Sequence, residues 1–438
     1  MLTIYADRES PRWKYISTVL LNEICGIAMQ HTTDIDFYLS AGNERINYSQ
    51  LRIAEDELFI PPVSLLFEEG IFEQNISVTS FKRTPVFFLN GKGDFPFDIF
   101  AASFYLLSRY EEYLPHRKDS YGRFDHTQSL AFREQFLDKP LVNFWLDDFR
   151  KLLVRKFPSL IIPVPAFRFM PTYDIDVAYA YLCRNLRRTV LGAGRSLLLG
   201  KPGEFMDRLK VLAGKRKDPY DVYEWLDALH LKYRLKPYYF FLLAEQQQGF
   251  DRNTDPNKKS FQYLISYHAM GYPVGLHPSW QSGENFELLA REKENLETHC
   301  GQEISGSRQH YIRLFMPDTY RRLIKLGIES DFSMGYGTIN GFRASVSSPY
   351  SWYDLEAEQA AKLRIYPYCF MDANALFEQH LTPAQAFEEI RYYHDVIKRV
   401  NGTMITIWHN SFFSDEPLYK GWKEVYEIFL NDVVYWDL

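Results

Sequence analysis

Two carboxylates separated by one residue, Asp174 and Asp176, are the side chains that most directly suggest chemistry. They follow a run of strand-forming residues at 167–170. Residues i and i+2 of an extended chain lie on the same side, so we expect both carboxylates to project together. Like charges this close are costly unless a cation or a shared proton relieves them. The pair fits a metal ligand beside a general base, and the alternative is a pair of solvated loop carboxylates.

Charged and imidazole side chains recur at the ends of four later segments that have the pattern of strands. They are, in chain order, His277, Arg308, His310, Asp331 and His409. A core histidine or a capping residue could explain any one of them. Five strand ends of this kind, counting the aspartate pair, are typical of an active site assembled from several strands.

The elements that must position these side chains alternate between strands and helices. Strand-like stretches lie at 167–173, 236–243, 273–277, 303–309, 328–332, 364–370 and 403–408. Helical patterns lie near 219–232, 258–270, 284–299, 318–326 and 382–400. Such alternation indicates parallel strands, and about seven of them within about 270 residues favour a (β/α) barrel over an open sheet. In barrel enzymes the functional side chains stand at the carboxyl ends of the strands, as these residues do.

The chain is predicted to have two domains. Residues 1–165 read as a smaller α/β domain of unassigned role, and residues 166–438 as the barrel. The boundary is placed at 161–165, where two prolines interrupt any regular element. Helices of the first domain are expected at 98–110 and near 142–156. The charged cluster at 109–112 is predicted to be a solvated helix end rather than a ligand site.

Composition excludes some classes of protein. The 438 residues carry 50 basic and 56 acidic side chains, a net charge of −6, which argues against a general nucleic-acid binder. Four widely separated cysteines predict buried thiols rather than a disulfide framework. The first residues lack an apolar core of signal-peptide length, and no apolar run reaches the roughly 18 residues of a spanning helix. A soluble, cytoplasmic protein is the expectation.

Residues 184–217 form a basic and partly apolar segment. It holds ten Arg or Lys residues against Glu204 and Asp207, with leucines and a valine among them. This mixture suits a surface segment that contacts an anionic membrane or a lipid-linked sugar. A solvated connection between the first strand and its helix is the simpler interpretation.

The ordered motifs resemble those of the polysaccharide deacetylase superfamily, the NodB-homology carbohydrate esterases, over about 165–438. The closest likeness is to a bacterial subgroup with an additional N-terminal domain. The stretch 172–176, Thr-Tyr-Asp-Ile-Asp, resembles the first motif of the family. The resemblance implies that Asp174 is the general base and that Asp176 is a metal ligand.

Three later stretches carry the rest of the resemblance. Residues 275–280 resemble the second motif, which implies that His277 is a metal ligand. Residues 407–409 resemble the closing motif, whose histidine, here His409, is the general acid. Arg308 occupies the place of the third motif, an arginine that shapes the groove wall.

The sequence departs from this family at the second motif. The family has His-x-x-x-His, and here the later position is Gln281. The implied site of two histidines and one aspartate then lacks a ligand. His310 could supply it from the neighbouring strand end; alternatively, the site holds a metal weakly or not at all. The fourth motif has no clean match.

The resemblance implies a metal-dependent hydrolase that removes an N-acetyl group from an amino sugar or glycan in bacterial surface polysaccharide biosynthesis. Asp176, His277 and His310 would hold a divalent ion, and this donor set favours zinc. Such an ion polarises the amide carbonyl and lowers the pKa of bound water to about 7. Asp174 would take the proton of the water and His409 would protonate the departing amine, while Arg308 would orient Asp174 or contact the substrate.

Two other functions stay open from the sequence. Gln281 favours a catalytically inactive, deacetylase-like module that binds a glycan or a partner, whereas the presence of both a base and an acid opposes it. The same machinery could also serve another C–N bond or an ester.

Overall fold

The computed structural model describes residues 1–183, 198 and 202–434. Much of the basic segment predicted to contact a membrane, namely 184–197 and 199–201, lies outside the described residues. Within the described part, no helix combines the length and the apolar character needed to cross a bilayer.

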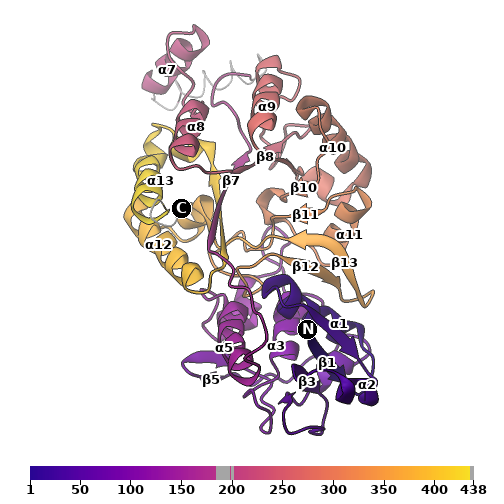
Figure 1. The fold of residues 1–438 in the computed structure, drawn as a ribbon. Helices are drawn as coiled ribbons and strands as arrows, with labels where there is room; N and C mark the ends of the chain where they lie inside the picture. The colour runs from indigo at the N-terminus through magenta and orange to yellow at the C-terminus, as the bar shows by residue number, and fades with distance from the viewer. Residues whose placement is uncertain (184–197, 199–201, 435–438) are drawn as a thin grey trace.

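The first part of the chain is built on a small parallel sheet (Figure 1). Its strands, in the spatial order β2-β1-β3-β4, are β1 (Leu2–Ala6), β2 (Met29–Thr32), β3 (Arg45–Tyr48) and β4 (Leu58–Phe59). The helices are α1 (Pro11–Ser17), α2 (Ile35–Ser40), α3 (Ile99–Leu107), α4 (Leu130–Arg133) and α5 (Leu141–Lys156), with a hairpin of β5 (Thr79–Phe81) and β6 (Thr84–Val86). Asp98 caps α3 by accepting the N–H of Ala101. All nine residues of α3 are buried, which makes this apolar helix the centre of the first core.

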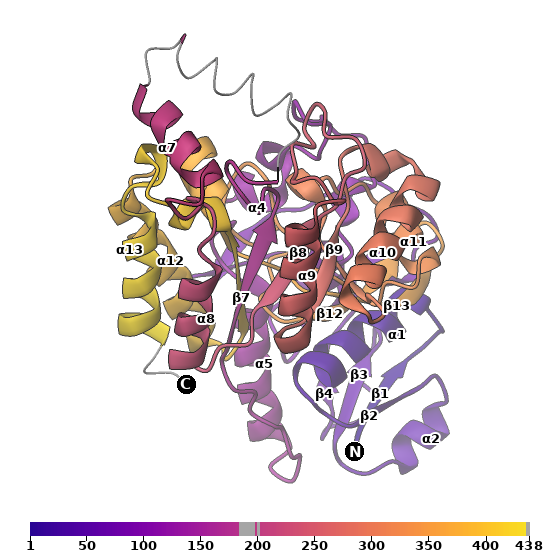
Figure 2. The ribbon, with the colours of Figure 1, turned by 90° about the horizontal axis from the view of Figure 1, so that it is seen from above.

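The second part contains a nine-stranded sheet in the order β12-β13-β11-β10-β9-β8-β7-β15-β14. Its strands are β7 (Arg168–Ile175), β8 (Tyr238–Leu242), β9 (Val274–His277), β10 (Gly306–Ser307), β11 (Ser330–Asp331), β12 (Tyr350–Asp354), β13 (Gln359–Ile365), β14 (Phe370–Met371) and β15 (Thr403–His409). The helices are α7 (Pro202–Leu212), α8 (Tyr223–Lys232), α9 (Lys259–Gly271), α10 (Phe286–Cys300), α11 (Asp318–Lys325), α12 (Pro383–Arg399) and α13 (Trp422–Phe429). Helices α8 to α13 lie around the outside of this sheet (Figures 1 and 2).

Alternation along β7 explains how one strand serves two faces of the sheet. Tyr173 and Ile175 belong to the core under the helices, and the Tyr173 hydroxyl lies 2.8 Å from Nε2 of His230 on α8. Thr172 and Asp174 therefore point to the opposite, inner face, where Asp174 lines a pocket. The period of two thus places the carboxylate on the face without helices.

The predicted seven-stranded barrel is not confirmed. Strand pairs are parallel from β13 through β14 along the sheet order, but β12 pairs antiparallel with β13 at one edge. In the described part of the chain no ladder joins β14 to β12 or β13, so the hydrogen-bonded sheet stays open. The predicted strand at 364–370 is two strands, β13 ending at Ile365 and β14 starting at Phe370. The strand–helix alternation is interrupted after β11, because the chain next forms a hairpin instead of a helix, and it resumes with α12 between β14 and β15.

The prediction of a solvated helix end at 109–112 is wrong. Arg109, Glu112 and Arg343, here called the interface network, are all buried. Nε of Arg109 donates to Oε1 of Glu112 at 2.8 Å. Arg343, from the second part of the chain, donates to the two oxygens of Glu112 at 2.8 and 2.6 Å. Charges that looked free in the sequence therefore join the first part of the chain to the second, and the domain boundary near 165 stays a prediction.

Candidate metal centre and catalytic pocket

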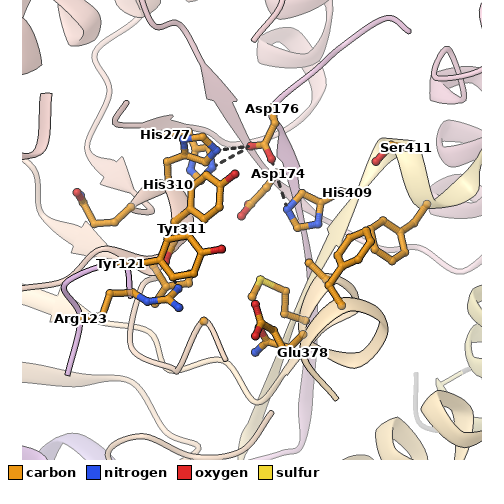
Figure 3. A pocket seen from close by; sticks show the side chains of 18 of the residues that line it. Tyr121, Arg123, Asp174, Asp176, His277, His310, Tyr311, Glu378, His409 and Ser411 are labelled. Atoms are coloured by element: carbon orange, nitrogen blue, oxygen red, sulfur yellow. Dashed lines mark hydrogen bonds and ion pairs between the residues drawn. The ribbon is translucent and has the colours of Figure 1, made fainter. Parts of the chain in front are cut away.

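A cavity of about 350 Å³ opens at the carboxyl ends of β7, β9 and β15 (Figure 3). Four of the strand ends predicted from the sequence reach it, through the side chains of Asp174, Asp176, His277, His310 and His409. Asp331 does not line it. The buried carboxylate of Asp331 instead accepts hydrogen bonds from Ser307 and Ser333, which is a structural role.

Asp176, His277 and His310 bring three ligand atoms to one point. Oδ1 of Asp176 lies 3.1 Å from Nε2 of His277 and 3.8 Å from Nε2 of His310. All three atoms lie within 4.8 Å of one another. Ligands of a tetrahedral zinc ion, at about 2.0–2.1 Å from the metal, stand roughly 3.3 Å apart. Oδ1 of Asp176 is buried without a hydrogen-bond partner, so the donor set fits a divalent cation.

Both imidazoles are held through the nitrogen that faces away from this point. Nδ1 of His277 lies 2.6 Å from the carbonyl oxygen of Arg308. Nδ1 of His310 lies 3.1 Å from Oδ1 of Asp251. A proton on each Nδ1 satisfies these acceptors and leaves both Nε2 lone pairs free. Metal-binding histidines are ordinarily oriented in this way.

Gln281, which replaces the later histidine of the second motif, does not line the cavity. Its side-chain amide donates to Oδ2 of Asp251 at 3.0 Å and to the carbonyl of Gln246 at 2.9 Å. Asp251 is thereby held against His310. His310 thus supplies the third donor of the candidate cation site, and Gln281 contacts the aspartate that holds it.

The charges of the cluster shift the pKa values of its members. Burial alone would raise the pKa of the Asp176 carboxyl, but His310, His277 and His409 outweigh it and hold that pKa well below its usual range. Burial lowers the pKa of His277, whereas Asp174 and Asp176 raise it above its ordinary value. The pocket therefore concentrates negative charge next to imidazole nitrogens, an arrangement that also attracts a cation.

Asp174 is held from behind by Arg308. Nη1 of Arg308 donates to Oδ1 of Asp174 at 2.8 Å and to Oγ1 of Thr172 at 2.5 Å. The guanidinium is fully buried, packs over the ring of Phe240 at 4.5 Å and does not line the cavity. Arg308 was predicted as a catalytic residue that either orients Asp174 or contacts substrate. The geometry supports only the first role, so we treat it as a positioning residue.

His409 stands on the opposite side of Asp176 from the other two histidines (Figure 3). Its Nε2 lies 3.7 Å from Oδ2 of Asp176, and its Nδ1 lies 2.6 Å from Oδ1 of Asp372. The backbone N–H of His409 donates to the other oxygen of Asp372 at 2.7 Å. Burial lowers the pKa of His409, but Asp372, Asp176 and Asp174 together raise it to about 10. A proton held on this ring faces the cavity.

Four residues of the site were missed by the sequence analysis. Asp372 lies two residues beyond the end of the predicted strand 364–370, so the rule that found the first aspartate pair could have found it as well. Asp251 lies in a loop after β8, and no pattern in the sequence marks it. Tyr121 and Arg123 come from the first part of the chain and line the same cavity. Nη1 of Arg123 donates to the carbonyl of Tyr311 at 2.6 Å, which ties that loop to the pocket wall.

Comparisons with known proteins give a family only for the first part of the chain. Residues 2–158 match the model of a family described as being of unknown function (DUF7033). No curated protein sequence matches the chain.

Solved structures with a similar fold cover about three fifths of the chain. A structure from Mycobacterium smegmatis named as a polysaccharide deacetylase is 14% identical, with a TM-score of 0.39, over 62% of this chain and 85% of that one. An allantoinase is 13% identical, with a TM-score of 0.39, over 61% and 84%. The polysaccharide deacetylase Bc1974 from Bacillus cereus is 10% identical, with a TM-score of 0.29, over 59% and 84%. These scores do not assign the chain to a family, so its function has to be argued from the site.

Proposed function

We propose that this protein is a metal-dependent hydrolase that removes an acetyl group from the nitrogen of an amino sugar or glycan. The observation that carries the proposal is the arrangement of the pocket: a three-residue cation site with a buried carboxylate on one side and a carboxylate-backed imidazole on the other. Amide hydrolysis needs these parts, because a water must lose a proton and a poor leaving group must gain one.

Asp176, His277 and His310 would hold the ion. When bound, a divalent cation such as zinc supplies a Lewis acid that polarises a carbonyl and acidifies water. Its identity is part of the proposal, since imidazole and carboxylate ligands also suit other transition ions.

Asp174 and His409 carry the two proton transfers in this proposal. Asp174, which accepts a hydrogen bond from Arg308 at 2.8 Å, takes a proton from the attacking water. His409, kept protonated by Asp372, gives its Nε2 proton to the amide nitrogen as the C–N bond breaks. Acetate and a free amino sugar are the products. After this transfer, the hydrogen bond to Asp372 keeps the imidazole oriented with Nε2 toward the cavity.

Fewer observations now favour the two alternative functions. The inactive-module hypothesis was favoured by Gln281, but Gln281 contacts Asp251, and His310 lies where it could supply the missing ligand. A metal hydrolase of a different C–N bond or of an ester uses the same residues, so only substrates can separate it from the deacetylase. Release of acetate from N-acetylated sugars, compared with O-acetylated sugars of the same ring, makes that distinction.

The experiment that tests the proposal measures metal content and turnover on the same preparations. His277→Ala should lose the ion, while Asp174→Asn should retain it and lose about 10²–10⁴-fold in turnover. His299→Ala, a histidine on α10 away from the cavity, is the matched control and should keep both. Wild-type protein that binds no stoichiometric metal after growth with trace metals would contradict the proposal.

A further inference from the structure

Helix α7 exposes three large apolar side chains and buries an arginine. Surface helices normally turn apolar residues inward and charged residues to solvent. On α7 the inward residues are Arg208 and Val211, which are 4% and 3% exposed. The exposed side chains are Met206 at 49%, Leu209 at 43% and Leu212 at 44%. Their spacing of three residues keeps these three side chains on one side of the helix.

Three charged side chains of α7 have charged or aromatic partners within the protein. The guanidinium of Arg208 packs over the ring of Tyr181 at 4.6 Å and lies 3.8 Å from Glu204. Asp207 pairs with Arg216 at 2.5 Å. The acidic groups of the helix are thus paired with bases, and they leave the outer apolar face free of negative charge.

Exposed lysines stand on α7 and directly after it. Lys210 and Lys215 are exposed, and within the described residues neither has a carboxylate at ion-pair distance. In the sequence immediately before the helix, 184–201, there are five Arg or Lys residues and no acidic residue. The whole segment 184–217 carries a net charge of +8 in a chain whose overall charge is −6. In the sequence, the positive charge is therefore concentrated in the segment that contains α7.

Helix α7 stands at the periphery of the molecule in both views (Figures 1 and 2). It belongs to the connection that leaves the carboxyl end of β7, the same end that carries Asp176 into the pocket. Val211 of α7 packs in a small apolar cluster with Tyr181 and Tyr220. The hydroxyl of Tyr220 in turn donates to Oε2 of Glu416 at 3.3 Å. Tyr419, three residues further, lines the pocket. A surface that receives α7 would therefore lie on the side of the molecule where the pocket opens.

We propose that α7 docks on an anionic lipid bilayer, with Met206, Leu209 and Leu212 among the headgroups and Lys210 and Lys215 facing lipid phosphates. An apolar stripe edged by lysines and arginines is the composition of an interfacial helix. Charge complementarity selects this occupant, since the rest of the chain is net acidic and a neutral surface would leave the lysines without partners. The inference does not depend on the proposed function. Combined with it, docking would favour an acetamido sugar that is held at a membrane by a lipid.

Vesicle flotation of the full chain tests the docking. Vesicles of phosphatidylcholine alone are compared with vesicles that also contain phosphatidylglycerol. Wild-type protein should float with the anionic vesicles, bind the neutral ones weakly, and be released by added salt. The triple variant Met206→Ser, Leu209→Ser, Leu212→Ser should bind the anionic vesicles at least about tenfold more weakly than the wild type, since each substitution removes apolar groups. Lys210→Glu with Lys215→Glu should lose the preference for anionic lipid.

The matched control is the double variant Leu231→Ser, Met270→Ser, which removes side chains that are 84% and 78% exposed on α8 and α9. It should bind vesicles like the wild type. Thermal unfolding and metal content are measured on every variant, so a folding defect or a failure of the proposed function is seen separately from lost binding. A wild type that ignores both vesicles, or a triple variant that binds unchanged, would overturn the inference. So would a wild-type dimer that the triple variant abolishes without any lipid binding, because the face would then be covered by a second copy.

Discussion

Two clusters of buried charged residues in this protein differ in whether every charged group has a hydrogen-bond or ion-pair partner. In the interface network, Arg109, Glu112 and Arg343 are at most 3% exposed, and the carboxylate is shared by two guanidinium groups. In the pocket, the Asp176 side chain is 30% exposed, and its Oδ1 has no hydrogen-bond donor. The first cluster is closed upon itself. The second leaves one oxygen and two nitrogens facing a cavity, which is the arrangement expected of a site that takes a ligand.

This difference shows why charge patterns alone mislead. Both clusters contain acidic and basic residues that end a regular element in the sequence, and both are largely buried. What separates them is the direction of the unsatisfied atoms. In the interface network, the buried charges are paired and connect the two parts of the chain. In the pocket, burying ligand atoms without partners costs free energy, which a bound cation would offset.

The largest effect is expected when the closed cluster is broken. Glu112→Ala leaves Arg109 and Arg343 buried without a carboxylate, which should cost about 3–5 kcal/mol in the free energy of unfolding. Chemical denaturation measures it. The control is Glu388→Ala, a side chain 61% exposed and paired with Arg391, whose loss should cost less than about 1 kcal/mol. Equal losses for the two variants would mean that the network contributes no more than a surface ion pair.

Acid should weaken the closed cluster in a defined pH window. Burial raises the pKa of Glu112, but Arg343 and Arg109 outweigh it and lower that pKa from 4.5 to about 2. A lowered pKa in the folded state gives stability that is complete above the unfolded value and is lost as the pH falls toward the folded value. The advantage of wild type over Glu112→Gln should therefore shrink by up to about 3 kcal/mol between about pH 5 and about pH 2. A difference that stays constant with pH would contradict the assigned pairing.

Much of the fold could be predicted where local chemistry decides the structure. The helix expected near 382–400 is α12, which begins with a capping box of Thr382 and Gln385 and has Pro383 in its first turn. The helix expected near 318–326 is α11, which begins at Asp318 after Pro317. The β12–β13 hairpin was missed. Its strands were hidden because long-range pairing, rather than a local turn signal, fixes them.

The same division holds for the site. The residues at strand ends were predictable, since alternation and parallel strands bring Asp176, His277 and His409 to one edge of the sheet. The residues that orient them were not, because Asp251 reaches His310 across 59 residues from a loop without any periodic pattern. Tyr121 was out of reach for a further reason. It belongs to the first part of the chain, and nothing in the sequence shows that this part reaches the pocket.

The smallest expected effect tests whether the open cluster depends on its supports. Asp251→Asn keeps the shape of the side chain but removes the charge that accepts from Nδ1 of His310 at 3.1 Å. Loss of such a support typically lowers metal affinity about 10–100-fold, measured here by competition with a chelator. Gln281→Ala, which acts only through Asp251, should lower it less.

Asp331→Asn is the matched control for Asp251→Asn, because Asp331 is also a buried carboxylate at a strand end but is satisfied by serine hydroxyls away from the cavity. It should reduce stability and leave metal affinity unchanged. If Asp251→Asn also left the affinity unchanged, His310 would not be a ligand whose orientation matters. The site would then reduce to Asp176 and His277, and the distinction between a closed and an open cluster would rest on those two residues alone.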